Sequence, residues 1–233
     1  MHENLLHMTG ICKAYTGRGR ESVSVLSDFY LGIRAGEEVG LSGPSGFGKS
    51  TVARIIMGIE VPDAGHVFWR DQIVCDATTQ PDREFFRKVQ MVWQDPFIYL
   101  NPFLSVRSSI VEPMAAFGIG SKRERRERAD SLMQTMGLDP NLGRYRPGML
   151  SGGQCQRAAI ARALAVSPEL LICDEALCGL DLPLQVDIMA HLTSVQEKSN
   201  MALLFISHDR DCISRVCSRT IYLDRQTNSL FPD

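Results

Sequence analysis

The chain has 233 residues, of which 44% are hydrophobic and 22% are charged, as in an ordinary soluble globular protein. Its formal net charge of −2 leaves no surplus of cations to neutralise a nucleic-acid backbone, so nucleic acid is not an expected partner. The longest apolar runs fall far short of the roughly 20 residues of a membrane-spanning helix, and the N-terminus lacks a secretory pattern. We expect a cytosolic chain with one domain whose lobes surround a sizeable core.

The first part of the chain predicts strands interrupted by one glycine-rich turn. Apolar residues alternate within the first 40 residues, and the pattern becomes helical after GPSGFGKST (43–51) until it stops at Gly58. HVFWRDQIV (66–74) and VQMVW (89–93) then resume strand-like character. The sequence therefore begins as a strand-rich region with a single turn inside it.

Residues from 95 to about 147 predict a mainly helical insertion. Ser121 and Glu124 fit a capping box at the start of one of its helices. The basic run Lys122–Arg128 has two interpretations, a docking patch or a solvated helix face. Because Glu124 and Glu127 lie at helix-pairing distance within this run, we favour the solvated face.

From residue 151 onward, helices and strands alternate. A helix over 153–166 precedes the apolar strand LLICD (170–174), a second helix begins at Pro183, and the strand ALLFIS (202–207) follows. A short helix and the strand TIYL complete the pattern. Strands that are apolar throughout indicate a parallel sheet covered on both faces, whose functional groups gather at the carboxyl ends of the strands.

The turn GPSGFGKST matches the pattern G-x-x-x-x-G-K-[ST] and lies between a predicted strand and a predicted helix. Its glycines let backbone N–H groups surround a triphosphate, and the helix start adds about half a positive charge. Lys49 would reach the β and γ phosphates, and Ser50 would ligate Mg²⁺. The predicted ATP-binding residues of this turn are Gly43, Pro44, Ser45, Gly46, Phe47, Gly48, Lys49, Ser50 and Thr51.

Two carboxylates follow the strand LLICD. Asp174 ends the strand and can hold the water shell of Mg²⁺, and Glu175 is placed to polarise an attacking water. Either carboxylate alone is more commonly a helix cap or a surface group. A P-loop elsewhere in the same chain favours the functional interpretation.

Further motifs follow one another in a set order. Gln94 lies in VWQDP, a second glycine turn SGGQ spans 151–154, Asp181 follows the carboxylate pair, and His208 lies in FISHD. In this order the chain resembles the ATP-binding-cassette (ABC) ATPases over nearly its whole length. The resemblance implies an α/β P-loop NTPase fold with a mostly parallel sheet core, an N-terminal antiparallel β region and a helical insertion subdomain.

The resemblance also implies roles for single residues. Tyr15 would stack on adenine, Gln94 would sense Mg²⁺ and the attacking water, and His208 would contact the γ-phosphate. The implied catalytic residues are Glu175, His208, Gln94 and Lys49, and the implied magnesium ligands are Ser50, Gln94 and Asp174. Each motif has a plain alternative: Tyr15 as a strand aromatic, Gln94 as a polar turn residue and His208 as a strand-end cap.

The second glycine turn differs from the first in its surroundings. Ser151 and the amides of Gly152 and Gly153 form an anion site at a helix start, but no sheet strand precedes the turn and it has no lysine. In the ABC family the equivalent of Ser151–Gln154 covers the γ-phosphate held by the P-loop of a partner in a head-to-tail dimer. The resemblance thus implies two half-sites, with Asp181 in the loop at the same interface.

The resemblance implies a single ABC ATPase domain over residues 1–233, with a catalytic lobe of approximately 1–94 and 160–233 and a helical signature subdomain of approximately 95–159. VWQDPFIYLNPFLSVRSSIVEPM (92–114) is similar to the peptide and nickel importer ATPases. Ala176 stands where the family usually has proline, and Cys178-Gly179 stand where Ser-Ala is common, so the loop carrying Asp181 is expected to communicate differently.

These similarities predict a Mg-dependent ATPase whose ATP-driven closure powers import of a peptide, nickel or metallophore-type substrate. The expected partners are integral-membrane permease subunits, a second ABC ATPase that is identical or a sister, and indirectly a substrate-binding protein. The expected location is the cytoplasmic face of the inner or plasma membrane. A soluble ABC-type ATPase that assists a multi-subunit enzyme, such as a carbon-phosphorus lyase system, remains the alternative.

Overall fold

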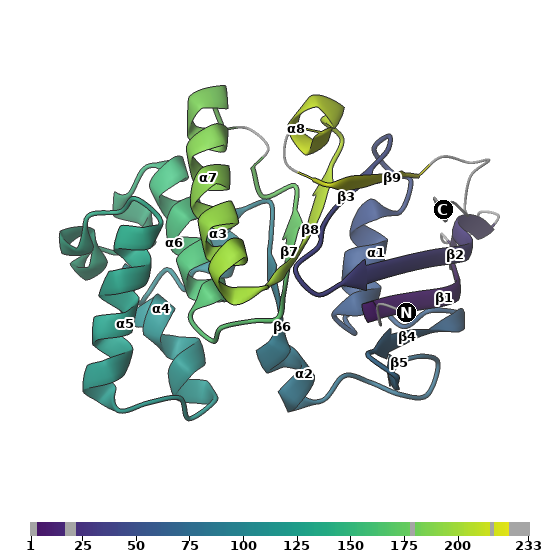
Figure 1. Ribbon diagram of the computed structural model, residues 1–233, viewed down its shortest axis with the longest axis horizontal. Coiled ribbons are helices and arrows are strands. Elements are labelled where there is room, and N and C mark those ends of the chain that lie inside the picture. Colours follow the sequence, from purple (N-terminus) through teal and green to yellow (C-terminus); the bar gives the residue numbers. More distant parts are fainter. Residues whose placement is uncertain (1–3, 17–21, 178–179, 215–216, 224–233) are drawn as a thin grey trace. The chain divides into compact units, whose positions relative to one another are not determined.

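The computed structural model describes residues 4–16, 22–177, 180–214 and 217–223, and the chain divides into two compact units. Residues 1–86 and 202–233 make up the first unit, and residues 87–201 make up the second. Figure 1 shows strands predominating in the first and helices in the second. None of the described helices is long and apolar enough to span a membrane.

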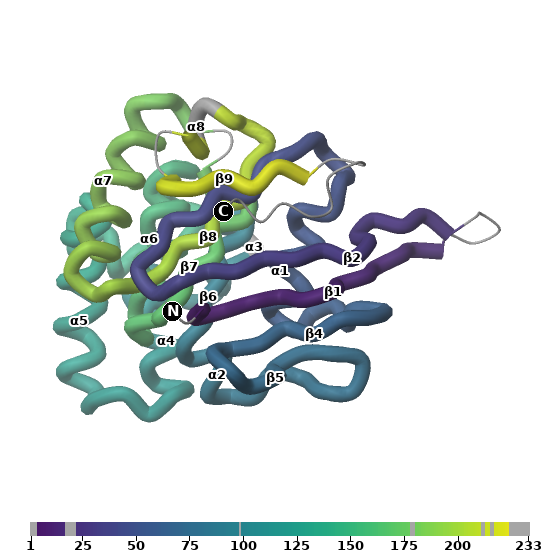
Figure 2. Tube along the Cα trace, turned by 45° about the vertical axis from the view of Figure 1, so that its right-hand side comes forward, coloured from purple at the N-terminus to yellow at the C-terminus, as the bar shows by residue number. Residues whose placement is uncertain are grey.

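The first unit opens with an antiparallel sheet in the order β2-β1-β4-β5. The strands are β1 (Asn4–Thr16), β2 (Ser22–Arg34), β4 (Ala64–Trp69) and β5 (Gln72–Cys75). β1 and β2 run side by side as a long ribbon (Figure 2), and they bury Ile11, Phe29 and Ile33. The strands expected in the first 40 residues are confirmed. The stretch 66–74 forms parts of two strands, because Arg70 has left-handed backbone (φ 55°) and the chain reverses there.

The first unit also contains a set of parallel strands. β3 (Glu38–Ser42) pairs with β8 (Ala202–Ser207) on one side and with β9 (Arg219–Tyr222) on the other. Every residue of β8 is buried, as expected for a strand covered on both faces. α1 (Lys49–Ile56) contacts β8, and α8 (Arg210–Ser214) contacts β3 and β8. The parallel sheet predicted from the apolar strands is confirmed.

The second unit is mainly helical, as the pattern of residues 95–147 predicts. α4 (Val106–Ala116), α5 (Lys122–Thr135) and α6 (Gly152–Leu164) pack on one another (Figure 1). α2 (Arg83–Lys88) is divided between the two units at residue 86. The remaining elements of the second unit are β6 (Val89–Val92), α3 (Pro96–Tyr99), the 3-10 turns η1 (Pro140–Arg144) and η2 (Pro147–Met149), β7 (Leu170–Asp174) and α7 (Leu182–Ser199). β6 and β7 form a parallel pair.

The capping box predicted at the start of α5 is confirmed. The Ser121 side chain accepts from the backbone N–H of Glu124, and the Glu124 carboxylate accepts from the backbone N–H of Ser121, which lowers the pKa of Glu124. Glu127 pairs with Arg123 one turn away, and both side chains are largely exposed. The basic run of α5 is therefore a mostly exposed helix face in which one glutamate pairs and the other caps, whereas Arg125 and Arg128 are half-buried and donate to Ile119 and Ser167.

Candidate functional site

The turn GPSGFGKST joins β3 to α1 within the first unit. Gly48 is the N-cap of α1 in left-handed backbone (φ 91°), and within the described chain no side chain caps this helix. A Cβ added to Gly48 would lie 2.7 Å from Cγ1 of Val25, and one added to Gly43 would lie 2.4 Å from the carbonyl oxygen of Leu223. Both positions therefore require glycine, and the turn presents an uncapped helix start to an anion.

Lys49 lies folded over this turn. Its side chain is only 5% exposed, and its Nζ donates to the carbonyl oxygens of Gly43 (2.8 Å) and Pro44 (3.0 Å). These neutral carbonyl acceptors hold the buried ammonium group at the start of α1. Phosphate oxygens are charged acceptors and form stronger hydrogen bonds with an ammonium group than carbonyls do. The local geometry therefore fits a polyphosphate.

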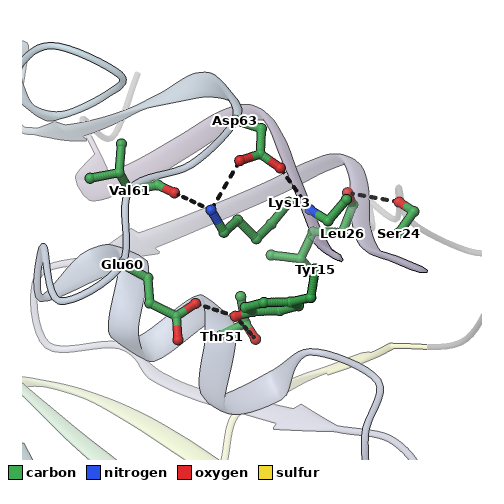
Figure 3. Close-up of polar contacts among 9 residues, drawn as sticks. Lys13, Tyr15, Ser24, Leu26, Thr51, Glu60, Val61 and Asp63 are labelled. Atoms are coloured by element: carbon green, nitrogen blue, oxygen red, sulfur yellow. Dashed lines mark hydrogen bonds and ion pairs between the residues drawn. The ribbon is translucent and has the colours of Figure 1, made fainter. Parts of the chain in front are cut away.

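Tyr15 lies beside the P-loop helix, although 36 positions separate it from Thr51 in the sequence. Its hydroxyl donates to the Glu60 carboxylate, and it lies 3.2 Å from the Thr51 hydroxyl (Figure 3). Since the phenol has a single proton, Thr51 is the donor in the second bond. Partial burial is the main cause that raises the pKa of Tyr15, and the hydrogen bond to Glu60 is the second. The phenol therefore remains neutral at physiological pH.

His208 reaches the same sheet end as the P-loop through strand register. Ser207, the residue before it, is the register partner of Ser42, the residue before Gly43. Because β3 and β8 are parallel, both chains leave the sheet at the same carboxyl edge. The first unit thus gathers the P-loop, Tyr15 and His208.

Gln94, Asp174 and Glu175 are gathered in the second unit. Val92 and Cys173 are register partners in the parallel pair β6–β7, so all three polar residues follow the same strand ends. Asp174 is 5% exposed. Glu175 has left-handed backbone (φ 50°), which costs a residue other than glycine about 1–2 kcal/mol. Such strain is often retained at functional sites.

The turn SGGQ begins α6 with a complete capping box. The backbone N–H of Gln154 donates to the Ser151 hydroxyl (3.3 Å), and the Ser151 N–H donates to the Gln154 side chain (3.0 Å). Ser151 and Gly152 are exposed. The turn borders a cavity of about 390 Å³ that is also lined by Gly137, Asp139, Arg157 and Leu184. An exposed helix start of this kind is accessible to a second molecule.

Asp181 is the exposed N-cap of α7, and its carbonyl oxygen accepts from the backbone N–H of Gln185 (3.0 Å). Ala176, the first departure from the family pattern, is buried. Cys178 and Gly179 lie outside the described residues, so the structure provides no test of the expected change in this loop.

The predicted magnesium ligands are Ser50, Gln94 and Asp174. Ser50, in the first unit, has a hydroxyl group, whereas Gln94 and Asp174, in the second, have an amide and a carboxylate. Within the part of the chain that the structure describes, no group of three or more His, Cys, Asp or Glu side chains could hold a metal ion. Mg²⁺ commonly takes only one or two protein ligands together with substrate phosphates and water. The residue types present therefore fit a magnesium ion shared with a nucleotide.

The structure also reveals two residues that sequence reasoning missed. Glu60 and Asp63 lie in IEVPD, directly after the P-loop helix, and both contact the end of β1 that carries Tyr15. No motif marks these carboxylates. The only signal in the sequence is a pair of acidic residues between a helix and a strand, which is common in loops.

Comparison with known proteins agrees with this geometry. The family profile described as ABC transporter matches residues 26–178. The nickel import ATP-binding protein NikE of Escherichia coli strain K12 is 38% identical over 224 residues, covering 94% of this chain and 84% of the relative, and NikE of Shigella sonnei matches equally well.

Solved structures show the same relationship. The ATP-binding cassette MJ0796, solved as a dimer in a post-hydrolysis state bound to ADP and Pi, matches with a TM-score of 0.83 and 31% identity over 94% of both chains. CbiO1 from Clostridium perfringens, described as part of the ABC transporter complex cbiONQ, matches with a TM-score of 0.80 and 25% identity over 95% of this chain and 85% of that one. The chain therefore belongs to the ABC transporter ATP-binding family, whose members are ATPases coupled to transport.

Proposed function

We propose that this ATPase powers an ABC importer for a peptide, nickel or metallophore-type substrate. The observation that carries ATP binding is the buried ammonium group of Lys49, held inside the P-loop at the start of α1 with Tyr15 beside the same helix. The similarity to nickel import ATP-binding proteins over 94% of the chain supports import. We retain the proposed division into a catalytic lobe (approximately 1–94 and 160–233) and a signature subdomain (approximately 95–159).

Nucleotide binding depends on the P-loop residues Gly43–Thr51. Their backbone surrounds the phosphates, Lys49 contacts the β and γ phosphates, and Tyr15 stacks on the adenine. Ser50, Gln94 and Asp174 are the groups that would hold Mg²⁺, which would neutralise phosphate charge. Tyr15 suits its role because the residue is 40% exposed while its hydroxyl is held by a hydrogen bond.

Three side chains act in the proposed hydrolysis. Glu175 orients the attacking water and accepts its proton, Gln94 senses the water and the metal, and His208 contacts the γ-phosphate. The support for Glu175 is its position directly after buried Asp174, in backbone that is unusual for a residue with a side chain. The support for His208 is the register that places it at the carboxyl edge beside the P-loop.

The turn Ser151–Gln154 and Asp181 act on the nucleotide of a second ATPase, identical or a sister, in a head-to-tail dimer. Three observations support this role: the turn is exposed, it begins a helix, and it has no lysine of its own. The related cassette MJ0796 was solved as a dimer. ATP that binds the closed dimer more tightly than the open one shifts the population toward closure, and this shift drives transport.

The remaining proposed partners are the integral-membrane permease subunits, which the ATPase meets at the cytoplasmic face of the membrane, and indirectly a substrate-binding protein. Affinity purification of the full chain from detergent-solubilised membranes, and separately from the soluble fraction, tests this assignment. We expect permease subunits to be recovered from the membrane extract. A complex recovered only from the soluble fraction would instead favour an accessory role in a multi-subunit enzyme.

The hydrolytic assignment is tested by Glu175→Gln. We expect ATP binding to be retained, hydrolysis to fall by about 10²–10⁴-fold, as for loss of a general base, and an ATP-bound dimer to accumulate. Turnover, nucleotide affinity and size-exclusion chromatography measure these effects. Glu197→Gln in α7 removes an exposed carboxylate from the same unit and serves as the matched control. Unchanged hydrolysis by Glu175→Gln would place the base elsewhere.

A further inference from the structure

The segment that follows α1 holds the end of β1 firmly. Lys13 Nζ donates to Asp63 Oδ1 (2.9 Å) and to the carbonyl oxygen of Val61 (2.7 Å), and the backbone N–H of Ala14 donates to Asp63 Oδ2 (2.7 Å). These hydrogen bonds, drawn in Figure 3, lower the pKa of Asp63 and keep it charged. Asp63 therefore holds the backbone of Ala14 and the side chain of Lys13, the two residues that precede Tyr15.

Glu60 holds the other end of the tyrosine side chain. It accepts the Tyr15 hydroxyl proton, and its Oε1 lies 3.1 Å from Nη1 of Arg54 in the last turn of α1. Its side chain is 20% exposed, so water competes only partly for these bonds. Tyr15 is thereby joined to the P-loop helix at two points, directly through Thr51 and indirectly through Glu60 and Arg54.

Such anchoring matters because Tyr15 is 40% exposed. A half-exposed aromatic side chain at a strand end otherwise populates several rotamers, and ordering it on binding costs free energy. A hydrogen bond to a carboxylate is stronger than one between neutral groups. Fixing the backbone through Asp63 and the hydroxyl through Glu60 sets the orientation of the ring before any ligand arrives.

We infer that Glu60 is a positioning residue for the base of the nucleotide: by holding the Tyr15 hydroxyl, it sets the ring at a fixed place relative to the P-loop helix. It contributes only the part of the affinity that depends on the base. This inference rests on the proposed function, in which Tyr15 stacks on adenine. Under the competing explanation, the Glu60–Arg54 ion pair stabilises α1 and has no bearing on the base.

The first test compares a ligand that has a base with one that lacks it. Displacement of N-methylanthraniloyl-ATP from the full chain by ATP or by inorganic triphosphate gives both affinities. We expect Glu60→Ala to weaken ATP binding about fivefold, a part of the tenfold or more that an aromatic–base stack supplies, and to leave triphosphate binding unchanged. Equal loss for both ligands would overturn the inference, because Glu60 would then act on the phosphate site.

Two conservative variants sharpen this test. Tyr15→Phe keeps the ring and removes the hydroxyl, and we expect the same selective loss of ATP affinity as with Glu60→Ala. Glu60→Gln keeps an acceptor for the hydroxyl, and we expect it to recover part of that affinity. Full ATP affinity in Tyr15→Phe would overturn the inference, since the anchored hydroxyl would then be irrelevant. Tyr15→Phe also preserves the Glu60–Arg54 pair, so full affinity in this variant overturns the inference even if Glu60→Ala misfolds, whereas a loss in Tyr15→Phe includes the bond to Thr51 and is assigned to Glu60 by the double-mutant cycle.

A double-mutant cycle shows whether Glu60 acts through the tyrosine. In the Tyr15→Ala background, Glu60→Ala should cause no additional loss of ATP affinity. An equal loss in both backgrounds would contradict the inference. Asp71→Ala, which removes an exposed carboxylate from the turn between β4 and β5 of the same unit, is the matched control and should bind ATP normally.

Failure of this inference and failure of the proposed function give different results. If Tyr15→Ala binds ATP as tightly as the wild type, Tyr15 is not the base platform and both ideas fall. If Tyr15→Ala weakens ATP binding while Glu60→Ala and Tyr15→Phe do not, only the positioning role is lost. Thermal unfolding of each variant identifies changes that come from loss of fold.

Discussion

Each of the two glycine turns of this chain starts a helix, but a side chain caps the helix start at only one of them. At the P-loop, the N-cap Gly48 has left-handed backbone and offers no side chain to the helix amides. At the second turn, Ser151 has extended backbone and caps α6 through a reciprocal box with Gln154. The P-loop leaves its helix start for a ligand, whereas at the second turn the side chains of the box already pair the backbone N–H groups of Ser151 and Gln154.

Packing separates the turns as well. Gly48 is enclosed by Val25 and Leu26, so a side chain at this position would collide with them. At Gly152, no described atom lies within 4 Å of an added Cβ. The contrast belongs to this pair of positions, since a Cβ added to Gly46 of the P-loop would meet no described atom within 4 Å, whereas one added to Gly153 of the second turn would lie 2.4 Å from Cδ2 of Leu184.

The largest effect is expected from Lys49→Ala. Because this variant removes the only side-chain cation of GPSGFGKST, we expect ATP hydrolysis to fall by at least about 100-fold, the scale seen on losing a group that stabilises developing charge. Steady-state turnover and nucleotide binding measure the change. Lys198→Ala, at the exposed end of α7, is the control. Normal turnover by Lys49→Ala would refute the P-loop assignment.

Ser151→Arg tests the other half of the comparison. A bulky cation on the exposed second turn should leave ATP binding by a single chain unchanged, because the P-loop lies elsewhere in the sequence. It should block hydrolysis wherever two chains must close over the nucleotide. Binding affinity and turnover, measured on the same preparation, check the prediction, and full turnover would remove the role of this turn across subunits.

Paired alanine substitutions at Gly48 and Gly152 give a smaller and purely structural test. Gly48→Ala should lower the free energy of unfolding by about 1–3 kcal/mol, because the new methyl group meets Val25 in left-handed backbone. Gly152→Ala should leave it unchanged or raise it by up to about 1 kcal/mol, since alanine is the better helix former. Urea denaturation measures both, and equal destabilisation would contradict the contrast between the turns.

The smallest effect is expected from Ser151→Ala. This change removes the capping hydroxyl of α6, and loss of such a cap costs about 1 kcal/mol of stability. Denaturant titration measures it, with Ser199→Ala near the end of α7 as a comparison outside any capping box. If Ser151→Ala does not lower stability, the reciprocal hydrogen bonds of this turn do not contribute to folding.

Local sequence patterns predicted the parts of this fold that depend on neighbouring residues. The apolar runs ALLFIS and LLICD read as buried parallel strands because every side chain is apolar except that of the last residue of each strand. The capping box at Ser121 and the glycine-lysine turn likewise involve residues within a few positions of one another. These features were therefore predictable from the sequence.

Contacts between distant segments were not predictable in this way. Sheet register places Ser207 opposite Ser42, and so brings His208 to the P-loop edge, but register depends on the pairing of strands far apart in the chain. The bond between Tyr15 and Glu60 joins residues 45 positions apart, and neither residue type specifies the other. For this reason the sequence indicated an aromatic for the base and gave no sign of what anchors it.

The left-handed backbone at Glu175 restricts which amino acids suit that position. Glycine would relieve about 1–2 kcal/mol of conformational strain, but it would also remove the carboxylate. A β-branched residue would be worse on both counts. With Glu175 as the proposed base, selection for a more robust fold and selection for turnover oppose each other at this residue, so a thermostabilised descendant that keeps glutamate here must have gained its stability elsewhere.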